Sequence, residues 1–505
     1  MQPGRPRNLV TAALMLGNAL AALEATAVAP ALPTAVAEMG GVARLSWIFS
    51  AYLLTSTTTV PLYGKLADLY GRRRIYHVAV TLFLLGSALS GVAHSIGQLI
   101  VFRAVQGLGA GGVQPIALIV VADIFALEER GRMQGLFSGV WAAASLIGPF
   151  LGGLITVAIS WRWIFYLNVP LGIASALLLQ RYLKEERGRR EHQLDVLGTV
   201  LLTVAATLLL LGLTEGPEAW GWGDRRTLAL FAGAVLGLAA FLWQERRAAE
   251  PMLPLSLFAN PVISVSGAGN AIIGIQLFAI TAYVPMFAQG VLGGSAVDAG
   301  TTLAPILIGW PIASTLSGRF ITRVPYRRLS IAGALLLCAG ALLLVHAGRA
   351  GGRGEVMAAM LISGLGLGLL STPFLIAIQS AVAWGQRGVA TSSVLFFRTI
   401  GGAVGVAALG ALFNARLAAA PGLHGADANA LLQPALRAQL APAALAGLVA
   451  ALRGALSSLY GVLAAVAVLS LAVALLFPAG SAAALAVEEI GDVAPAAELD
   501  AETLA

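Results

Sequence analysis

Charged residues are scarce in this chain of 505 residues, because only 11% are Asp, Glu, Lys or Arg while 58% are hydrophobic. Soluble domains carry roughly 25% charged residues, so the composition excludes an ordinary soluble protein. Apolar runs of the roughly 20 residues that a helical membrane span needs recur from residue 9 to residue 477. The alternating segments typical of membrane β-strands do not occur. The sequence therefore predicts an all-α polytopic membrane protein.

Cysteine is nearly absent as well. The single Cys338 excludes an intrachain disulfide and a CxxC metal or redox pair. The five histidines are scattered without ligand spacing, so neither a metal site nor a cofactor is predicted. The Walker loop, HExxH and GxSxG signatures are missing too. We therefore expect that the protein is not an enzyme, and that any transport work draws on an ion gradient.

The apolar runs predict fourteen membrane spans. With the N-terminus inside, inner segments carry twenty of the 31 Lys and Arg residues and outer segments carry nine. The positive-inside rule then places both termini in the cytoplasm. The net charge of +7 thus reflects topology, and no nucleic-acid partner is expected. The approximate span limits are 9–31, 46–64, 75–94, 97–122, 134–159, 162–181, 195–213, 227–243, 261–292, 299–320, 329–348, 356–383, 388–415 and 457–477.

An internal repeat relates the two halves of the chain. GKLADLYGRRR (64–74) aligns with GRFITRVPYRR (318–328) at a shift of 254. GLGAGG (107–112) aligns with GLGLGL (364–369) at a shift of 257, and GPFLG (148–152) with GGAVG (401–405) at 253. Near-constant shifts indicate two parallel six-helix halves with helices seven and eight inserted between them. Parallel halves place a substrate path at their interface near the bilayer midplane.

These patterns divide the chain into four predicted units. The last unit carries acids and no bases, which is typical of a disordered cytoplasmic tail. The units are an N-terminal six-helix bundle (1–190), an inserted helix pair (191–260), a C-terminal six-helix bundle (261–478) with a long outer loop (416–456), and an acidic tail (479–505).

Two opposite charges stand inside apolar runs of the first half. Glu24 lies in the first run and Arg103 in the fourth, each about 10 Å below the predicted outer end at 1.5 Å per residue. A charge at that depth costs at least ~2.5–3.5 kcal/mol, which argues against an unpaired structural role. A carboxyl group away from water favours its protonated form, and a nearby arginine favours the carboxylate. Proton coupling is our preferred role for the two residues, and the alternatives are a static ion pair and an outer-vestibule position.

The loop 64–74 is the most specific string in the chain. Its glycines allow tight turns, and its acid and arginines can make charge-assisted hydrogen bonds to a neighbouring helix end. The G-x-x-x-D-x-x-G-R-R spacing favours a conformational latch over a simple positive-inside anchor. The predicted latch residues are Gly64, Asp68, Gly71, Arg72, Arg73 and Asp123.

The fifth span carries the string GVWAAASLIGPFLGG (139–153). Glycines permit close helix contact, and a proline inside a helix removes a backbone hydrogen bond and kinks it. Helix packing explains any one of these residues, but the whole string favours a hinge or gate. Its residues are Gly139, Gly148, Pro149, Gly152 and Gly153.

Polar and aromatic residues inside the spans are candidates for a substrate cavity. In a membrane such residues face protein or water, and interhelical hydrogen bonding is the ordinary alternative. Arg398 has no acid in the apolar cores of spans nine to fourteen, so a structural role and contact with an anionic substrate group both stay open. The candidates are Thr26, Tyr52, Ser56, Gln106, Gln114, Asn270, Gln276, Tyr283, Trp310, Gln379, Phe397 and Arg398.

These strings resemble the major facilitator superfamily, and specifically its EmrB/QacA-type fourteen-helix drug–proton antiporters. The loop 64–74 matches the superfamily's inter-helix signature, and LIVFRAVQGLGAGG (99–112) matches its fourth-helix motif with Arg103 at the membrane arginine. The string 139–153 matches the antiporter motif, and SWRWIFYLNVPLG (160–172) matches the subgroup's entry to helix six. The first-helix string LEATAVAPALP (23–33) departs, because Glu24 replaces an aspartate and Ala29 an asparagine.

The resemblance implies a major facilitator fold with two six-helix bundles plus two inserted helices. It further implies a proton-coupled antiporter for multidrug efflux, acting on amphipathic, cationic or neutral drug-like compounds from a bacterial cytoplasmic membrane. The expected partners are protons, small amphipathic substrates and the lipid bilayer, and a periplasmic adaptor is left open. Two alternatives stay open, namely an exporter of an endogenous lipid or metabolite, for which loop 416–456 would matter, and a non-transporting membrane sensor or scaffold.

Overall fold

The computed structural model describes residues 5–39, 45–183, 195–214, 216, 220–248, 251, 253–418, 431 and 437–479. Fourteen α-helices of nineteen residues or more make up most of these ranges. The predicted acidic tail falls outside the described residues from position 480 onward. The centre of the predicted outer loop (416–456) also falls outside them, apart from position 431.

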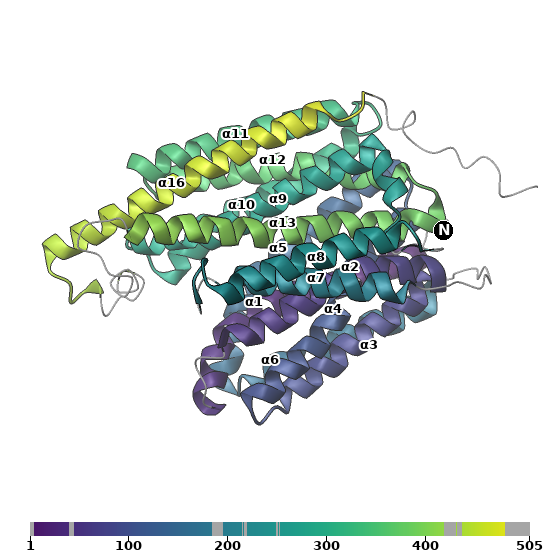
Figure 1. Cartoon of the computed structure of the whole chain (residues 1–505), viewed down its shortest axis with the longest axis horizontal. Helices are drawn as coiled ribbons and strands as arrows, with labels where there is room; N and C mark the ends of the chain where they lie inside the picture. The colour runs from purple at the N-terminus through teal and green to yellow at the C-terminus, as the bar shows by residue number, and fades with distance from the viewer. Residues whose placement is uncertain are drawn as a thin grey trace, which may run out of the picture.

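The helices form two bundles of six with a pair between them (Figure 1). The first bundle consists of α1 (Arg5–Met39), α2 (Leu45–Tyr70), α3 (Arg72–Gly91), α4 (Ile96–Ile124), α5 (Leu127–Ala158) and α6 (Arg162–Tyr182). The inserted pair is α7 (Val196–Thr214) and α8 (Arg225–Glu245). The second bundle consists of α9 (Pro261–Met286), α10 (Ala296–Phe320), α11 (Tyr326–Ala350), α12 (Arg353–Ser380), α13 (Arg387–Ala418) and α16 (Pro442–Leu475). Short helical turns η3 (Leu255–Ala259), η4 (Phe287–Val291) and η5 (Trp384–Gln386) connect some of them.

Each predicted span corresponds to one of these fourteen helices. Twelve helices of the described part are long and apolar enough to cross a membrane by length and composition. The other two are α7, whose apolar stretch Leu197–Leu213 is shorter, and α2, which carries Ser, Thr and Tyr along its length. The last helix begins at Pro442 rather than near 457, so the final part of the predicted outer loop is helical. Proline suits the first helical position, because its missing N–H has no intrahelical partner there.

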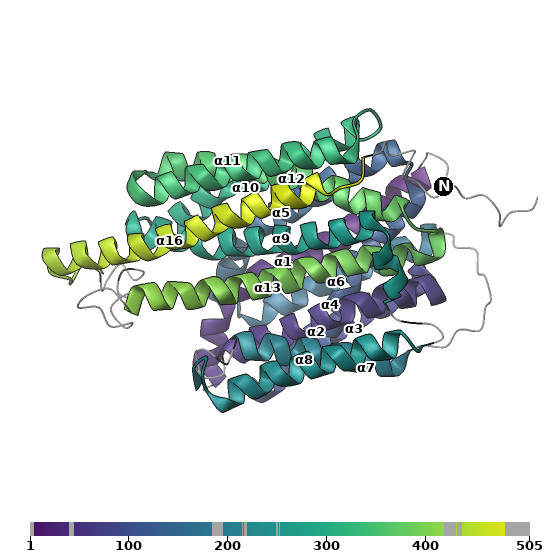
Figure 2. The same ribbon diagram turned by 45° about the horizontal axis from the view of Figure 1, so that its top comes forward.

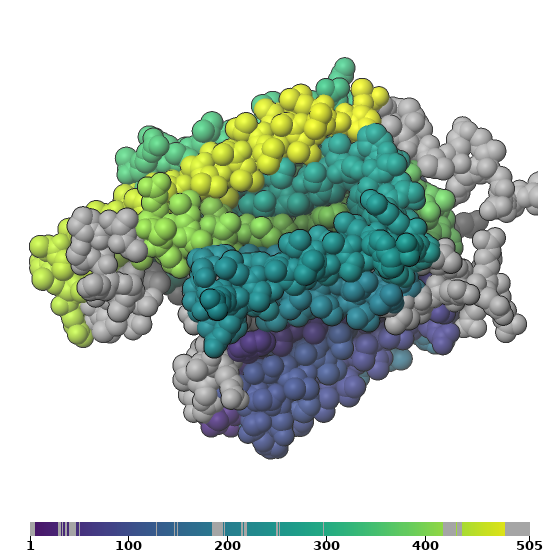
Figure 3. All heavy atoms as spheres, in the orientation of Figure 1, coloured from purple at the N-terminus to yellow at the C-terminus, as the bar shows by residue number. Residues whose placement is uncertain are grey.

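The bundles meet mainly where α2 packs on α13 and α5 packs on α10, and α4 with α13 and α5 with α12 make smaller contacts. The inserted pair packs on α2 and α13 through α7, and it runs along one side of the molecule (Figure 2). In the space-filling view its teal surface lies over the boundary between the bundles (Figure 3). We call the end of the molecule at which α2 ends and α13 begins the latch end, and the N-terminus lies at this end too (Figure 1).

Close backbone approach holds the helices together inside each bundle. Lipid is as apolar as leucine, so helices in a membrane associate through packing and hydrogen bonds rather than through the hydrophobic effect. Gly366 on α12 shows the consequence, because an added Cβ would lie 2.8 Å from the carbonyl oxygen of Gly333 on α11. Leu337 lies beside this contact and is fully buried, as are other large apolar side chains of the same core such as Leu459.

Candidate functional site

The two charges buried in the first bundle contact each other. Arg103 on α4 forms an ion pair with Glu24 on α1 through its Nη1 atom, and both side chains are at most 2% exposed. The same nitrogen donates a hydrogen bond to Oε1 of Gln106 at 2.7 Å. Asn168 on α6 donates from Nδ2 to the second oxygen of Glu24 at 2.5 Å. Three helices thus converge on one carboxylate.

Aromatic rings cover the guanidinium group of this pair. The Cζ atom of Arg103 lies 4.3 Å from the ring centroid of Tyr52 and 5.8 Å from that of Phe165. A ring face attracts a cation, and the attraction strengthens where water is excluded. Asn168 is held in turn by a bond to Oγ of Ser87 at 3.0 Å. Arg103 therefore has favourable contacts besides Glu24.

Asn168 was not singled out from the sequence, although it stands inside the string 160–172. Its role depends on α6 packing against α1 and α3, which the one-dimensional pattern does not reveal. The same string begins with a second cluster. Trp161 and Arg162 donate to the two carboxylate oxygens of Glu38, each at 2.7 Å. The hydrogen bonds from Arg162 and Trp161 lower the pKa of Glu38 and tie the end of α1 to the start of α6.

Arg72 is the centre of the latch end. Its guanidinium contacts Asp68 at 2.9 Å and Asp123 at 3.1 Å, which is the predicted partner on α4. It also reaches the second bundle, where Nη2 donates to the carbonyl oxygen of Trp384 at 3.0 Å and Cζ lies 3.9 Å from its ring centroid. Asp123 contacts Arg387 of the second bundle at 3.5 Å. Arg72 and Asp123 of the first bundle therefore contact the second bundle at η5 and at the start of α13.

Asp68 caps a helix of the other bundle. Its carboxylate accepts hydrogen bonds from the backbone N–H groups of Gly388 at 3.0 Å and Val389 at 2.9 Å. The first turn of a helix leaves its N–H groups without intrahelical acceptors, and α13 has no acidic residue of its own there. A carboxylate at this position satisfies those donors and complements the positive end of the helix dipole. The acid thus joins the first bundle to the first turn of α13.

The other latch residues have more local contacts. Arg73 donates to Oε1 of Gln180 and to the carbonyl oxygen of Leu183, both at 3.3 Å, and so binds the end of α6. Gly71 has a φ of 92°, a left-handed conformation that favours glycine, and it permits the sharp turn from α2 into α3. A Cβ on Gly64 would lie 2.5 Å from the carbonyl oxygen of Gly388.

Glycine contacts repeat at both junctions between the bundles. Gly64 meets Gly388 where α2 packs on α13, and Gly131 meets Gly318 where α5 packs on α10. Gly318 is the repeat equivalent of Gly64 at the shift of 254, and Gly388 is that of Gly131 at the shift of 257. The Arg-Gly pairs 130–131 and 387–388 were a usable signal that the sequence interpretation missed. The repeat therefore builds two equivalent close junctions at the latch end.

The fifth-helix glycines contact two different elements. A Cβ on Gly148 or Gly152 would collide with Thr26 or Ala27 of α1, whereas one on Gly153 would meet no atom within 4 Å. A Cβ on Gly139 would lie 3.9 Å from Cβ of Pro311 in the second bundle. Helix α5 continues through position 149, but the side chain of Pro149 lies outside the described part.

The candidate cavity residues separate into three groups. Tyr52 and Gln106 surround the Glu24–Arg103 pair, while Asn270 and Trp310 surround Arg398. The third group lies at neither arginine. Most of its members bond to backbone carbonyl groups or pack on an aromatic ring, and one is partly exposed. They are Thr26 and Ser56, bonded within their own helices; Gln276, bonded to Leu463; Tyr283, bonded to Val406; Gln379, bonded to Leu118; Phe397, packed on Phe258; and Gln114, partly exposed.

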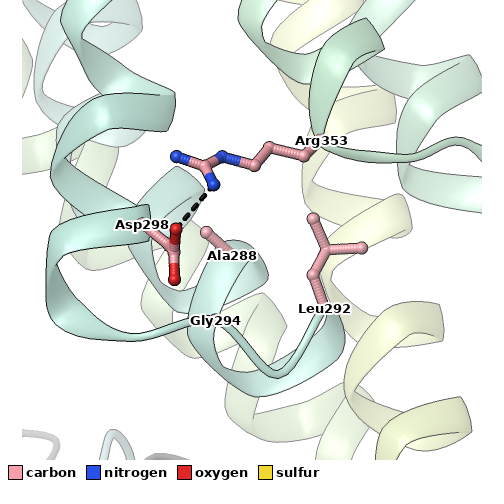
Figure 4. Close-up of a pocket in the computed structure, with 5 residues that line it drawn as sticks. All are labelled: Ala288, Leu292, Gly294, Asp298 and Arg353. Carbon is pink, nitrogen blue, oxygen red and sulfur yellow. Dashed lines mark hydrogen bonds and ion pairs between the residues drawn. The ribbon is translucent and has the colours of Figure 1, made fainter.

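A cavity of about 290 Å³ lies near the starts of α10 and α12, away from the Glu24–Arg103 pair and at the end of the second bundle opposite the latch end. Figure 4 shows the residues that line it. Ala288, Leu292 and Gly294 line it beside the ion pair of Asp298 and Arg353, whose atoms are 2.5 Å apart. Ser295 is the N-cap of α10, and Asp298 completes a capping box with it, because its carboxylate accepts a hydrogen bond from the backbone N–H of Ser295. The capping box and the ion pair with Arg353 are both structural roles for Asp298.

A model of the Major Facilitator Superfamily matches residues 14–406, so the chain belongs to this family of membrane transporters rather than enzymes. The Multidrug transporter protein MdtP of Bacillus subtilis (strain 168) is 37% identical over 410 residues, covering 81% of this chain and 76% of that protein. Multidrug resistance protein 3 of the same organism is 35% identical over 401 residues, covering 79% and 78%. The MFS-type efflux pump LUC4 of Fusarium is 34% identical over 430 residues, covering 82% and 76%.

Solved structures agree on the fold. The proton:xylose symporter XylE superposes with a TM-score of 0.60 at 14% identity, covering 92% of this chain and 94% of that one. The human organic anion transporter MFSD10 (TETRAN) gives 0.59 at 15% identity, covering 92% and 100%. These likenesses confirm the predicted major facilitator fold. The chain is a multi-pass membrane transporter of small substrates, and its relatives are named multidrug transporters and efflux pumps.

Proposed function

We propose that this protein is a proton-coupled antiporter that exports amphipathic drug-like compounds across a bacterial cytoplasmic membrane. The names of the relatives support export of drugs. The observation that carries proton coupling is the buried carboxylate of Glu24, held between Arg103 and Asn168. An ionisable residue inside a membrane is expensive to keep and is by default a functional-site hypothesis. The fourteen-helix drug–proton subgroup is part of this proposal, supported by the inserted pair α7 and α8.

In the proposed cycle, protonation of Glu24 removes one charge of the ion pair. Arg103 then keeps its bond to Gln106 and its contact with the ring of Tyr52. Loss of the ion pair loosens α1 from α4, and a proton leaves when the pair forms again. A transporter couples two ligands when each shifts the same conformational equilibrium. The proton and the compound would compete in this way through α1, which also packs on the glycines of α5.

We assign the latch end to the cytoplasm because basic residues gather there. The hydrogen bonds that Gly388 and Val389 donate to Asp68 join the bundles at this end, so we infer that the structure represents the state closed to the cytoplasm. Opening the cytoplasmic side requires these bonds to break. The latch residues therefore set the balance between the two states, and the glycine junctions allow the bundles to meet closely.

Dye efflux from proteoliposomes under an imposed pH gradient tests this function, with wild type compared to Glu24→Gln. The gradient is expected to drive wild-type export, and the variant is expected to lose that drive while it still binds the dye. Glu129→Gln is the matched control, because Glu129 also pairs with an arginine, Arg7, but is 38% exposed at the latch end. If Glu24→Gln responds to the gradient as wild type does, Glu24 is only half of a structural pair.

A further inference from the structure

Arg398 is a cation inside the second bundle, and it has no counter-ion in the part of the chain that the structure describes. Its Nε and Nη2 atoms donate to Oδ1 of Asn270 on α9, at 3.1 Å and 2.6 Å. Asn270 is fixed in that orientation because its own Nδ2 donates to the carbonyl oxygen of Ser266 at 2.9 Å. Among the described residues, no carboxylate contacts Arg398. An amide oxygen can orient a guanidinium group, but it does not neutralise its charge.

The charges deep inside the helices therefore do not balance. Glu24 and Arg103 form a neutral pair in the first bundle, and Arg398 adds an uncompensated positive charge in the second. A lone cation at membrane depth is costly and faces protein or a water-filled cavity. An arginine buried at this depth is rarely without an acid beside it, and Arg103 has one. The imbalance points to a negative charge that arrives from outside the chain.

Arg398 stands where such a ligand can reach it. At 1.5 Å per residue, it lies about 16 Å along α13 from Arg387, and Asn270 lies about 14 Å along α9 from Pro261. Trp310 on α10 is at a similar distance from its helix end, and its ring centroid is 5.9 Å from Cζ of Arg398. Helices α10 and α13 both contact the first bundle. The side chain of Arg398 is partly exposed at this mid-membrane level.

Polar groups near Arg398 lack partners among the described residues. The indole Nε1 of Trp310 is buried and has no hydrogen-bond acceptor. The hydroxyls of Ser314, one turn along α10 toward the latch end, and of Ser266, one turn along α9 in the same direction, are also buried and unpaired. Unpaired buried polar atoms are uncommon and mark places for water or a ligand. The unpaired donors thus extend from Arg398 toward the end assigned to the cytoplasm.

We propose that Arg398, oriented by Asn270, binds a carboxylate or sulfonate group on the compounds that this transporter exports. Arginine presents a planar fork of N–H groups that fits such an anion, and the indole N–H of Trp310 adds a further donor. This inference rests on the proposed export function, and it narrows the substrates to amphipathic compounds that carry an acidic group. The sequence resemblance had favoured cationic or neutral compounds instead.

The test uses two rhodamine dyes that differ in one group, a free carboxylate and its methyl ester. Fluorescence anisotropy measures the affinity of each dye for the full-length protein in lipid nanodiscs. Wild type is expected to prefer the acid, and Arg398→Gln is expected to weaken acid binding relative to ester binding by about tenfold or more, as for a lost charge-assisted bond. Arg398→Lys should keep part of the preference, because it keeps the charge. Arg416→Gln, exposed on the same helix, is the matched control and should behave as wild type.

A second variant keeps Arg398 and supplies the missing counter-ion. Asn270→Asp is expected to abolish the preference for the acid dye, because the new carboxylate neutralises Arg398 from within the protein. Equal loss of both affinities in Arg398→Gln, or an unchanged ratio in both variants, would overturn the proposal and leave Arg398 a structural residue. A failure of the proposed export function gives a different result. In that case the pH gradient does not change dye efflux from proteoliposomes, while the ratio of acid to ester affinity still shows whether Arg398 binds the anion.

Discussion

Replacing Asp68 by Asn is the sharpest perturbation of the latch end. The carboxylate is 2% exposed and accepts two backbone bonds from α13, besides its ion pair with Arg72. An asparagine of the same size can accept one of these bonds through its oxygen but presents N–H groups to the other donor. The variant therefore changes charge and hydrogen bonding between the bundles with little change in volume.

The size of the effect follows from these contacts. A hydrogen bond to a charged group contributes about 1.5–3 kcal/mol and a neutral one about 0.5–1.5 kcal/mol. Losing one bond and weakening the other destabilises the closed latch end by about 3 kcal/mol. Since each 1.4 kcal/mol is a factor of ten, the open state should gain about 100-fold in relative population.

Hydrogen–deuterium exchange of the backbone amides of Gly388 and Val389 measures this shift directly. In wild type both amides donate to Asp68 and should exchange slowly, and in Asp68→Asn they should exchange about 10- to 100-fold faster. The matched control is Glu129→Gln, which removes a latch-end carboxylate that pairs within the first bundle. Unchanged exchange at the two amides in Asp68→Asn would refute the idea that this acid holds the bundles closed.

Two further substitutions test the glycine contacts. Gly131→Ala is expected to push α5 away from Gly318 and open the latch end by about 1–3 kcal/mol, because the added Cβ has no room. The same exchange measurement reports it, and Gly454→Ala on α16, with nothing within 4 Å, should leave the exchange unchanged. Gly148→Ala is expected to lower the melting temperature in detergent by loosening α1, whereas Gly153→Ala should not, and equal effects of the two would contradict this assignment.

The helices could be predicted from local properties. Apolar length marks twelve of the fourteen helices in the described part of the chain, with α2 and α7 as the exceptions. The start of a helix is marked by capping residues such as Ser95 and Asn260, whose side chains accept hydrogen bonds from the next turn. The start of α16 was misplaced because alanine-rich sequence is compatible both with a surface helix and with the beginning of a span. Whether such a segment becomes a surface helix or part of a span depends on the helices that it packs against. The sequence of the segment alone does not contain that information.

The site could be predicted in part. Counting 1.5 Å per residue placed Glu24 and Arg103 at one depth, because rise along a helix is a local quantity. The third member, Asn168, stayed hidden, since which helix faces the carboxylate depends on how α6 packs. Asp68 shows the same limit. Its loop marked it as important, but its bond to the first turn of α13 joins segments 320 residues apart.

The sequence by itself determined that this chain spans a membrane, that it consists of two related halves and that three charges stand deep inside its helices. Composition, repeat shifts and residue type are properties of the chain alone. Only the tertiary structure decided which of those charges are neutralised, because neutralisation depends on distances between helices. Arg103 has a carboxylate beside it and Arg398 has an amide, although both are arginines in apolar runs.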